Sequence, residues 1–350
     1  MFLIVFLLAC FILAYYNQQN YLVPPHVEEY ASLQTSLDKP YYKSYNPSGI
    51  SNFNSGYTIT VSRYTSHNYC PSSFFNSLVA YHLIDQSNHE TEYSHLRLKV
   101  ERQGQPALFG FLDTRSISSI GQFEDPRILA LDSETIAVAC TLYIAKTTRM
   151  CIFFVKPLDL LSSKDHLVRP STAIQYFSRT QRQKNWMMRL ESQGTLLLHA
   201  SLDTVYSLNF NSLVGLTNQV EIPDVQLTKW SGSTPFRNTP MGLLCLVHRR
   251  SKSTVLSPIP KFVNAFVLMY KDGSKQFSQS FVLYAEKCPT NFTYVSGLDV
   301  TDTSFVLYLG IHDCYAVKAS MTYAFVEALF ANKDSAEVLK IRNLRCERVE

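Results

Sequence analysis

The chain has 350 residues, of which 46% are hydrophobic and 17% are charged, so it can bury a large core and is not a disordered protein. Its formal net charge is only +4, and its Lys and Arg residues are spread along the sequence, which gives no support for nucleic-acid binding.

The chain begins with an uncharged apolar segment at residues 1–16. This segment is shorter than the roughly 20 apolar residues of a membrane-spanning helix, but it suits targeting to the endoplasmic reticulum. We expect either a retained signal anchor or a cleaved signal peptide, followed by a polar stem at residues 17–42. The protein would then be a single-pass membrane protein that faces the lumen of the ER or Golgi, or a secreted protein.

Residues 43–330 contain many short segments rich in Val, Ile, Tyr, Phe and Thr, separated by Gly, Asn, Asp, Ser and Pro. Examples are "GYTITVSRY", "ETIAVACTLYIA" and "TSFVLYLG". This pattern predicts an all-β fold, and the length suits a five-bladed β-propeller with about 50 to 60 residues in each blade. The tail, residues 331–350, places apolar residues behind Asp334 and Ser335 as possible N-caps, which predicts a short C-terminal helix.

Eight cysteines are present, one of them in the apolar segment, so the remaining seven cannot all pair within the chain. Cys140 and Cys151 flank a predicted hairpin, where they would form either a disulfide or two buried thiols. No Cys-x-x-Cys or His-Glu-x-x-His pattern occurs, and no metal site is predicted. One glycosylation sequon stands at Asn291.

The segment "FEDPRIL" crowds three charged residues around a proline at the start of a predicted strand. Proline fixes its own φ and restricts the residue before it, so Asp125 should point in one fixed direction. Side chains alternate along a strand, so Asp125 and Arg127 should share one face while Glu124 occupies the other. A fixed carboxylate beside a guanidinium suits a sugar or phosphate site. The alternative is an ion pair that ends a blade.

Five segments that follow one another between residues 45 and 318 together carry a family resemblance. They resemble the five-bladed propeller enzymes of glycoside hydrolase family 130, the β-mannoside phosphorylases, and their glycosyltransferase-like relatives. The segments are "YNPSGI" with the following "GYTITVSRYTSHNY", "FEDPRIL", "QKNWMMRLESQGTLLLHASL", "GSTPFRNTPMGLLCLVH" and "YLGIHDC".

The resemblance implies that Asp125 is the general acid that protonates the leaving oxygen. Lys184 and His248 match positions that face a phosphate or the anionic part of a donor, and Asp313 matches an acid that accepts sugar hydroxyls. Without the resemblance, Lys184 reads as a surface lysine and Asp313 as a turn residue that caps a strand. The full set of implied substrate contacts is Arg63, Glu124, Arg127, Lys184, Asn185, His248 and Asp313.

This chain also departs from the family pattern. The phosphorylases carry an Arg directly after the His of an "HRP" pattern, where this chain reads His199, Ala200 and Ser201. Fewer basic residues weaken the case for phosphate as the nucleophile and leave a transferase, a hydrolase or a catalytically inactive sugar binder open.

We interpret the chain as a carbohydrate-active protein of the secretory pathway that transfers or cleaves a hexose, mannose in the first place, on glycans. The alternatives are a non-catalytic glycan-binding propeller and a propeller that binds protein through an exposed aromatic patch. No cofactor is implied, although inorganic phosphate or a nucleotide sugar would serve as a co-substrate. The expected partners are a glycan or sugar-phosphate substrate and a membrane contacted through residues 1–16.

Overall fold

The structure, a computed structural model, describes part of the chain, and the statements below concern that part. The described residues are 26–29, 43–54, 56–65, 77–85, 90–96, 98–102, 105–109, 122–144, 147–159, 167–168, 172–180, 183–191, 194–210, 218–223, 229–250, 262–287, 293–311, 315–331 and 337–345. The apolar segment 1–16, the sequon at Asn291 and Asp313 lie outside them.

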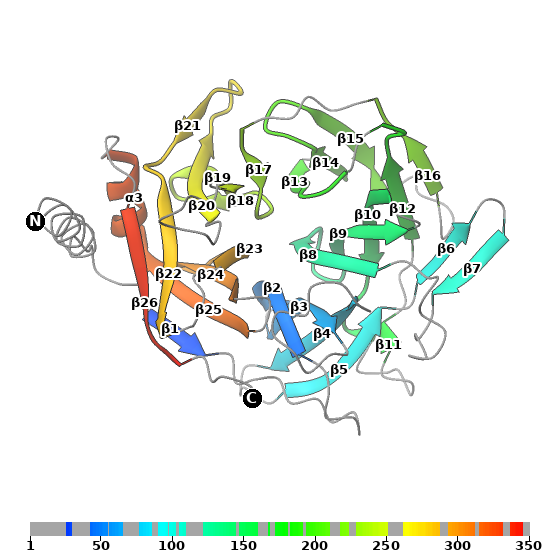
Figure 1. Cartoon of the computed structure of the whole chain (residues 1–350), viewed down its shortest axis with the longest axis horizontal. Coiled ribbons are helices and arrows are strands. Elements are labelled where there is room, and N and C mark those ends of the chain that lie inside the picture. Colours follow the sequence, from blue (N-terminus) through cyan, green and yellow to red (C-terminus); the bar gives the residue numbers. More distant parts are fainter. Residues whose placement is uncertain are drawn as a thin grey trace, which may run out of the picture.

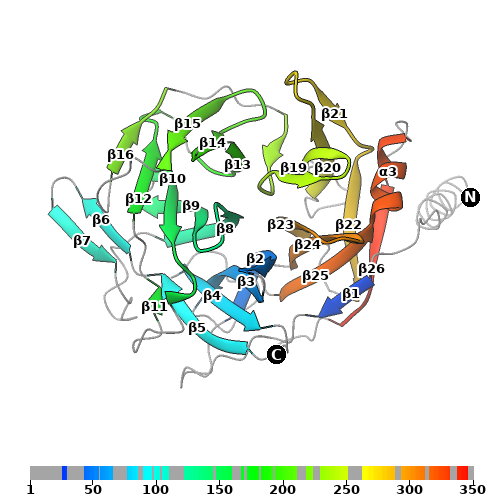
Figure 2. The same ribbon diagram turned by 180° about the vertical axis from the view of Figure 1, so that it is seen from behind.

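The described chain is all-β, with its sheets set around a common centre in a propeller-like ring (Figures 1 and 2). This confirms the predicted all-β class and the propeller-like arrangement. The first sheet contains β2 (Lys43–Phe53), β3 (Tyr57–Thr65), β4 (Ser77–Asp85), β5 (Glu90–Leu96) and β11 (Leu167–Val168). The second contains β8 (Gln122–Ala130), β9 (Ile136–Ile144), β10 (Thr147–Val155), β12 (Thr172–Phe177) and β16 (Asn218–Glu221).

The second half of the chain continues the ring. A three-stranded sheet contains β13 (Met187–Glu191), β14 (Thr195–His199) and β15 (Val205–Asn209). The next sheet contains β17 (Ser231–Gly232), β18 (Arg237–Thr239), β19 (Gly242–Arg250), β20 (Phe262–Met269), β21 (Lys275–Phe277), β22 (Phe281–Lys287) and β26 (Glu337–Arg345). The last contains β23 (Thr293–Val300), β24 (Ser304–Ile311), β25 (Tyr315–Thr322) and β1 (His26–Glu29). A separate hairpin joins β6 (Leu98–Arg102) and β7 (Gln105–Phe109).

Strands from the two ends of the chain complete the late sheets. β1 pairs antiparallel with β25, placing His26 opposite Ser320. β26 pairs parallel with β22, placing Glu337 opposite Phe281. The pairing of β1 with β25 links an early segment of the chain to the last sheet of the ring.

The strand β9 shows why its sequence is an almost unbroken apolar run. Ile136, Val138 and Cys140 point into one hydrophobic cluster, while Ala137 and Ala139 point into the cluster on the other face of the sheet. All five are fully buried. Since neighbouring sheets cover both faces, neither face needs polar side chains.

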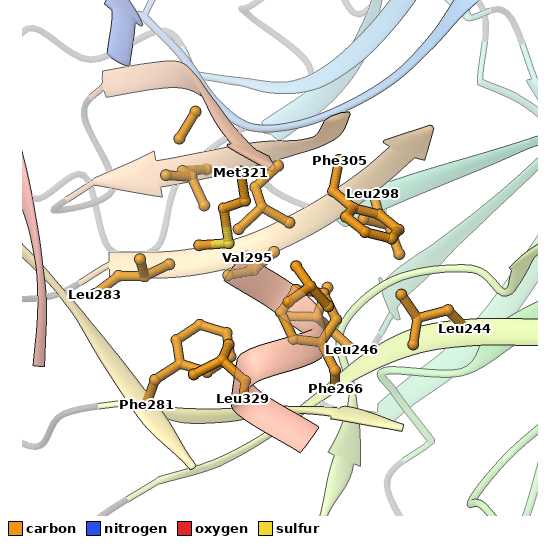
Figure 3. Close-up of a cluster of buried hydrophobic side chains, with 14 of the residues drawn as sticks. Leu244, Leu246, Phe266, Phe281, Leu283, Val295, Leu298, Phe305, Met321 and Leu329 are labelled. Carbon is orange, nitrogen blue, oxygen red and sulfur yellow. The ribbon is translucent and has the colours of Figure 1, made fainter. Parts of the chain in front are cut away.

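A short helix near the C-terminus is confirmed, but its position differs from the prediction. Helix α3 spans Tyr323–Ala331 and buries Val326, Leu329 and Phe330. These residues share one apolar cluster with strands β19, β20 and β22 to β25, which Figure 3 shows around Phe266, Phe281 and Phe305. The stretch predicted as helix instead forms β26 over Glu337–Arg345. Pairing with the open edge of β22 overrides the local helical pattern.

The expected membrane localisation is corrected by the structure. Within the described ranges, no helix is long and apolar enough to cross a membrane. A single-pass membrane protein is therefore not supported.

Candidate active site

The "EDPR" stretch lies on β8, an inner strand at the centre of the ring (Figure 1). Glu124 pairs with Thr141 and Arg127 with Ala139, so the two residues between them face Cys140 alone. Two residues opposite one define a β-bulge, which re-aims a side chain. Asp125 sits in this bulge with a φ of 48°. The even alternation predicted for this strand therefore does not hold.

A second bulge of the same kind lies in the neighbouring inner strand β2. Tyr45 pairs with Arg63 and Ser48 with Val61, which leaves Asn46 and Pro47 opposite one residue. Asn46 has a φ of 49°. Asn and Asp adopt this left-handed conformation more readily than most other residues with a side chain. Both bulges thus consist of an Asn or Asp in the left-handed region followed by a proline.

The side chains of Asn46 and Asp125, one from each bulge, contact each other. Asn46 Nδ2 donates a hydrogen bond to Asp125 Oδ1 at 2.6 Å. Asn46 is 4% exposed, whereas Asp125 is partly exposed. One carboxylate oxygen of Asp125 is therefore held by a buried donor, while the residue itself stays partly exposed.

The side chain of Glu124 has a different partner from that of Asp125. Its Oε1 lies 3.3 Å from Arg63 Nη2 and forms an ion pair with it. The Arg63 side chain is almost buried. Burial raises the pKa of Glu124; the Arg63 charge lowers it, the Asp125 charge raises it and the Lys184 charge lowers it. A carboxyl group with a raised pKa beside a second carboxylate is typical of sites that use acid and base catalysis.

Arg127 lies at the junction of several inner elements and is fully buried. Its Nε donates to the carbonyl oxygen of Ser233 at 2.6 Å, and Nη1 donates to the main-chain oxygen of Asp125 at 3.1 Å. Nη2 donates to Asn185 Oδ1 at 3.2 Å and to the hydroxyl of Tyr294. In the part of the chain that the structure describes, no ion pair joins Arg127 to the Asp125 carboxylate. Its donors are directed to protein oxygens and hold the inner strands together.

Lys184 and Asn185 precede β13 and differ in burial. Asn185 has a φ of 63° and is buried, and its Oδ1 also accepts a hydrogen bond from the Tyr294 hydroxyl at 3.4 Å. Lys184 is exposed. Its charge lowers the pKa of both Glu124 and His248. The charge of Lys184 therefore acts on the protonation of Glu124 and His248.

His248 is buried on β19 and is held by a hydroxyl. Its Nδ1 lies 2.7 Å from Ser233 Oγ, and its ring packs edge-on against Phe262 and Tyr294. Burial lowers the pKa of His248 to about 3, and the neighbouring Arg127 charge also lowers it. The imidazole is thus neutral near neutral pH, so it offers an anion a hydrogen bond but no charge.

The structure thus brings most of the predicted residues to one place. The predicted residues found together are Arg63, Glu124, Asp125, Arg127, Lys184, Asn185 and His248. Asp313 lies outside the described residues, and so does Asn291. Sequence reasoning missed Asn46, Ser233 and Tyr294 as members of the site. The first two lie in the quoted "YNPSGI" and "GSTPF" segments, which carried the signal, whereas no pattern marked Tyr294.

Across the described ranges, no group of three or more His, Cys, Asp and Glu side chains is placed to hold a metal ion.

Comparison with known proteins finds solved structures with a similar fold. No protein-family model and no curated protein matches the chain. Solved structures do match, and one comes from work on the GH130 family of mannoside phosphorylases and its glycoside hydrolases that target β-1,2 mannosidic linkages in Candida mannan. It has a TM-score of 0.53 and 10% identity, and the match covers 87% of this chain and 97% of that chain.

Two further structures come from Leishmania. MPT-1, a GDP-Man-dependent mannosyltransferase from Leishmania mexicana, matches with a TM-score of 0.52 and 13% identity over 89% of this chain and 93% of that chain. A hypothetical protein from Leishmania major matches with a TM-score of 0.51 and 13% identity over 89% and 94%. The resemblance predicted from the sequence is confirmed at the level of the fold.

Proposed function

We propose that this chain is a carbohydrate-active enzyme that transfers or cleaves a hexose, with mannose as the preferred sugar and Asp125 as the acid. The observation that carries the proposal is the meeting of the two proline bulges at the Asp125 carboxylate. A carboxyl group that is held on one oxygen and reachable on the other suits proton delivery to a leaving oxygen. The shared fold with a GDP-Man-dependent mannosyltransferase supports mannose.

The contacts of the neighbouring residues suggest a role for each of them. Lys184 is exposed and would face the anionic part of a donor or a phosphate. His248 and Asn185 would offer neutral hydrogen-bonding groups, and Arg127 would act on the sugar only through the residues that it holds. Asp313 stays a proposed contact to sugar hydroxyls on the strength of the sequence resemblance.

A second candidate function is glycan binding without catalysis. It is favoured because two cationic side chains near Asp125 are already bonded to protein groups. Arg127 is fully buried and bonded to protein oxygens, and Arg63 pairs with Glu124. An anionic nucleophile or donor would then depend largely on Lys184.

We also propose that the propeller has five blades. Four of the described sheets have four or more strands, and the three-stranded sheet β13-β14-β15 would be a reduced fifth blade. The position of that sheet between the sheets of β8 and β19 supports this reading (Figure 1).

The purified full-length chain would be incubated with mannose 1-phosphate, GDP-mannose and manno-oligosaccharides, each with and without phosphate, and the products identified by mass spectrometry. Asp125→Asn is the test variant because Asn tolerates the left-handed conformation. Asp132→Asn is the matched control, since Asp132 is exposed in a turn of the same sheet. A product formed by the wild type and the control but not by Asp125→Asn supports the proposal. Turnover retained in Asp125→Asn refutes the role of the acid, and glycan binding without turnover in all three favours the second candidate.

A further inference from the structure

We propose that Asn46 is the positioning residue of this site. Its amide occupies Oδ1 of Asp125, so that the transferred proton is carried on Oδ2. This inference rests on the proposed function, because it concerns the step in which Asp125 acts as an acid. In that step the bond between the anomeric carbon and the leaving oxygen breaks, and the leaving oxygen takes the proton from Oδ2. An oxygen nucleophile, either water, phosphate or a sugar hydroxyl, supplies the electron pair of the new bond, and water or a sugar hydroxyl releases its own proton to solvent.

The first argument is that Asn46 is held rigidly. The carbonyl oxygen of the next residue, Pro47, accepts a hydrogen bond from Ser296 Oγ at 2.6 Å. Ser48 Oγ accepts one from the backbone N–H of Ile128 at 3.2 Å. The triplet Asn46-Pro47-Ser48 is thus fastened to β23 on one side and to β8 on the other. A side chain on so constrained a backbone can hold another group in a fixed direction.

The second argument is the space behind the amide. A Cβ at Gly310 would lie 1.7 Å from Asn46 Oδ1 and 2.9 Å from the Asn46 backbone nitrogen. Only a glycine therefore leaves room for Asn46 at this point of β24. The Gly310 backbone therefore lies directly against the Asn46 amide.

The third argument is an unsatisfied atom. Asn46 Oδ1 is buried without a hydrogen-bond partner in the described structure, while Nδ2 donates to Asp125. Buried polar atoms are rarely left unpaired, and an exception calls for a functional explanation. The orientation that leaves Oδ1 unpaired is the one that gives Asp125 a donor, since the opposite orientation would set two acceptor oxygens against each other unless Oδ1 of Asp125 carried the proton.

Other groups around Asp125 supply charge but no second fixed donor to its carboxylate in the described part of the chain. Glu124 and Arg127 come from the same strand, Lys184 from the residues before β13, and His248 and Tyr294 from β19 and β23. Cys140 lies opposite the bulge on β9. Replacing Asn46 leaves all of these in place.

The test uses two variants and one control. Asn46→Asp keeps the size and the left-handed preference but replaces the N–H donor by an oxygen, and Asn46→Gly removes the amide at a residue type that accepts this φ. Asn54→Asp is the control, because Asn54 also has a positive φ of 46° but is exposed in the turn between β2 and β3. Circular dichroism would verify that all three are folded.

In steady-state assays we expect kcat to fall at least about tenfold in both Asn46 variants, with KM changed less than about threefold. In Asn46→Asp the alkaline limb of the pH profile should also move up by about one pH unit or more, because two adjacent carboxylates share a proton. A structural defect alone would not move that limb. Unchanged kcat and an unchanged limb in both variants would overturn the inference.

A second readout does not depend on turnover. The carboxyl carbons of Asp would be labelled with ¹³C, and the Asp125 signal assigned by its absence in Asp125→Asn. We expect this signal to titrate at higher pH in Asn46→Asp than in the wild type and in Asn54→Asp. Equal midpoints would overturn the inference. A wild type without turnover overturns the proposed function, and the titration then decides separately whether Asn46 controls the protonation of Asp125.

Discussion

The guanidinium of Arg127 and the carbonyl oxygen of Ser233 are joined by a hydrogen bond of 2.6 Å between residues that lie 106 positions apart in the sequence. Nη2 of the same side chain donates to the main-chain oxygen of Gly232, to Asn185 Oδ1 and to the Tyr294 hydroxyl. A buried charge is tolerated only where hydrogen bonds replace its hydration. Arg127 therefore acts as a structural centre that connects four inner elements of the ring.

Replacing Arg127 by Met should lower the free energy of unfolding by about 3 kcal/mol or more, since several buried oxygens lose a charged donor at once. Urea denaturation of the purified variant measures this change. Arg179→Met is the control. The Arg179 side chain is 79% exposed and pairs with the half-exposed Glu221, so its effect should stay within about 0.5 kcal/mol. Equal effects of the two substitutions would contradict the structural role of Arg127.

The buried side chain of His199 should make the stability of the folded protein depend on pH. It is buried, and neither ring nitrogen has a partner in the described structure. Burial, together with the charges of Arg189 and Lys275, lowers the pKa of His199 to about 4. Above the ordinary histidine pKa near 6.5, both the folded and the unfolded states are neutral at this residue, and stability is complete. As pH falls from about 6.5 toward 4, the unfolded state takes up a proton that the folded state refuses, so stability decreases.

The measurement is a series of urea or thermal unfolding curves from neutral pH down to about pH 4.5. In this range His199 should contribute up to about 1.4 kcal/mol of lost stability per pH unit. His199→Leu removes the titrating group without breaking a hydrogen bond, so its stability should fall less steeply with pH. His248, with its pKa also lowered by burial, continues to contribute in that variant. A slope identical to that of the wild type would show that His199 does not titrate on unfolding.

Much of the fold was accessible from the sequence because propeller strands are local features. Runs such as "IAVAC" on β9 carry the mark of a strand buried on both faces, and the turn residues between runs separate the strands. The site was accessible for a related reason. Each group of site residues lies on a short contiguous segment. The ring brings the inner strands of its sheets together around the centre (Figure 2).

The features that could not be predicted depend on long-range pairing. A bulge at Asp125 is invisible in a segment that otherwise reads as an even strand, because it is defined by what β9 offers opposite to it. The tail over Glu337–Arg345 has a local pattern compatible with a helix, yet it pairs with β22 more than 50 residues earlier. Tyr294 reaches Arg127 across 167 positions of sequence, and no local pattern could place it.

The three cysteines that the structure describes should be unreactive in the folded protein. Cys140 and Cys151 face each other across β9 and β10, as predicted, and Cys245 is buried in β19. Burial raises the pKa of all three thiols. Because the thiolate is the reactive form, Ellman's reagent should not modify these residues under native conditions and should modify them in urea. Mass spectrometry of the labelled peptides identifies each site, and native labelling of Cys140 or Cys151 at the rate found in urea would contradict their burial.

Gly310→Ala tests the space behind Asn46 without touching either member of the hydrogen bond. The added methyl group would lie 1.7 Å from Asn46 Oδ1 and 2.9 Å from its backbone nitrogen, distances that force the bulge of β2 to move. Since Asn46 then leaves Asp125, we expect kcat to fall at least about tenfold, with a loss of stability of about 1–3 kcal/mol from overpacking. Gly56→Ala is the control, because the nearest atom to its added Cβ is 3.9 Å away. Rates and unfolding curves of the two variants would be compared under identical conditions. Normal turnover in Gly310→Ala would mean that Asp125 acts without the Asn46 contact, and equal losses in both variants would mean that any added methyl group is poorly tolerated.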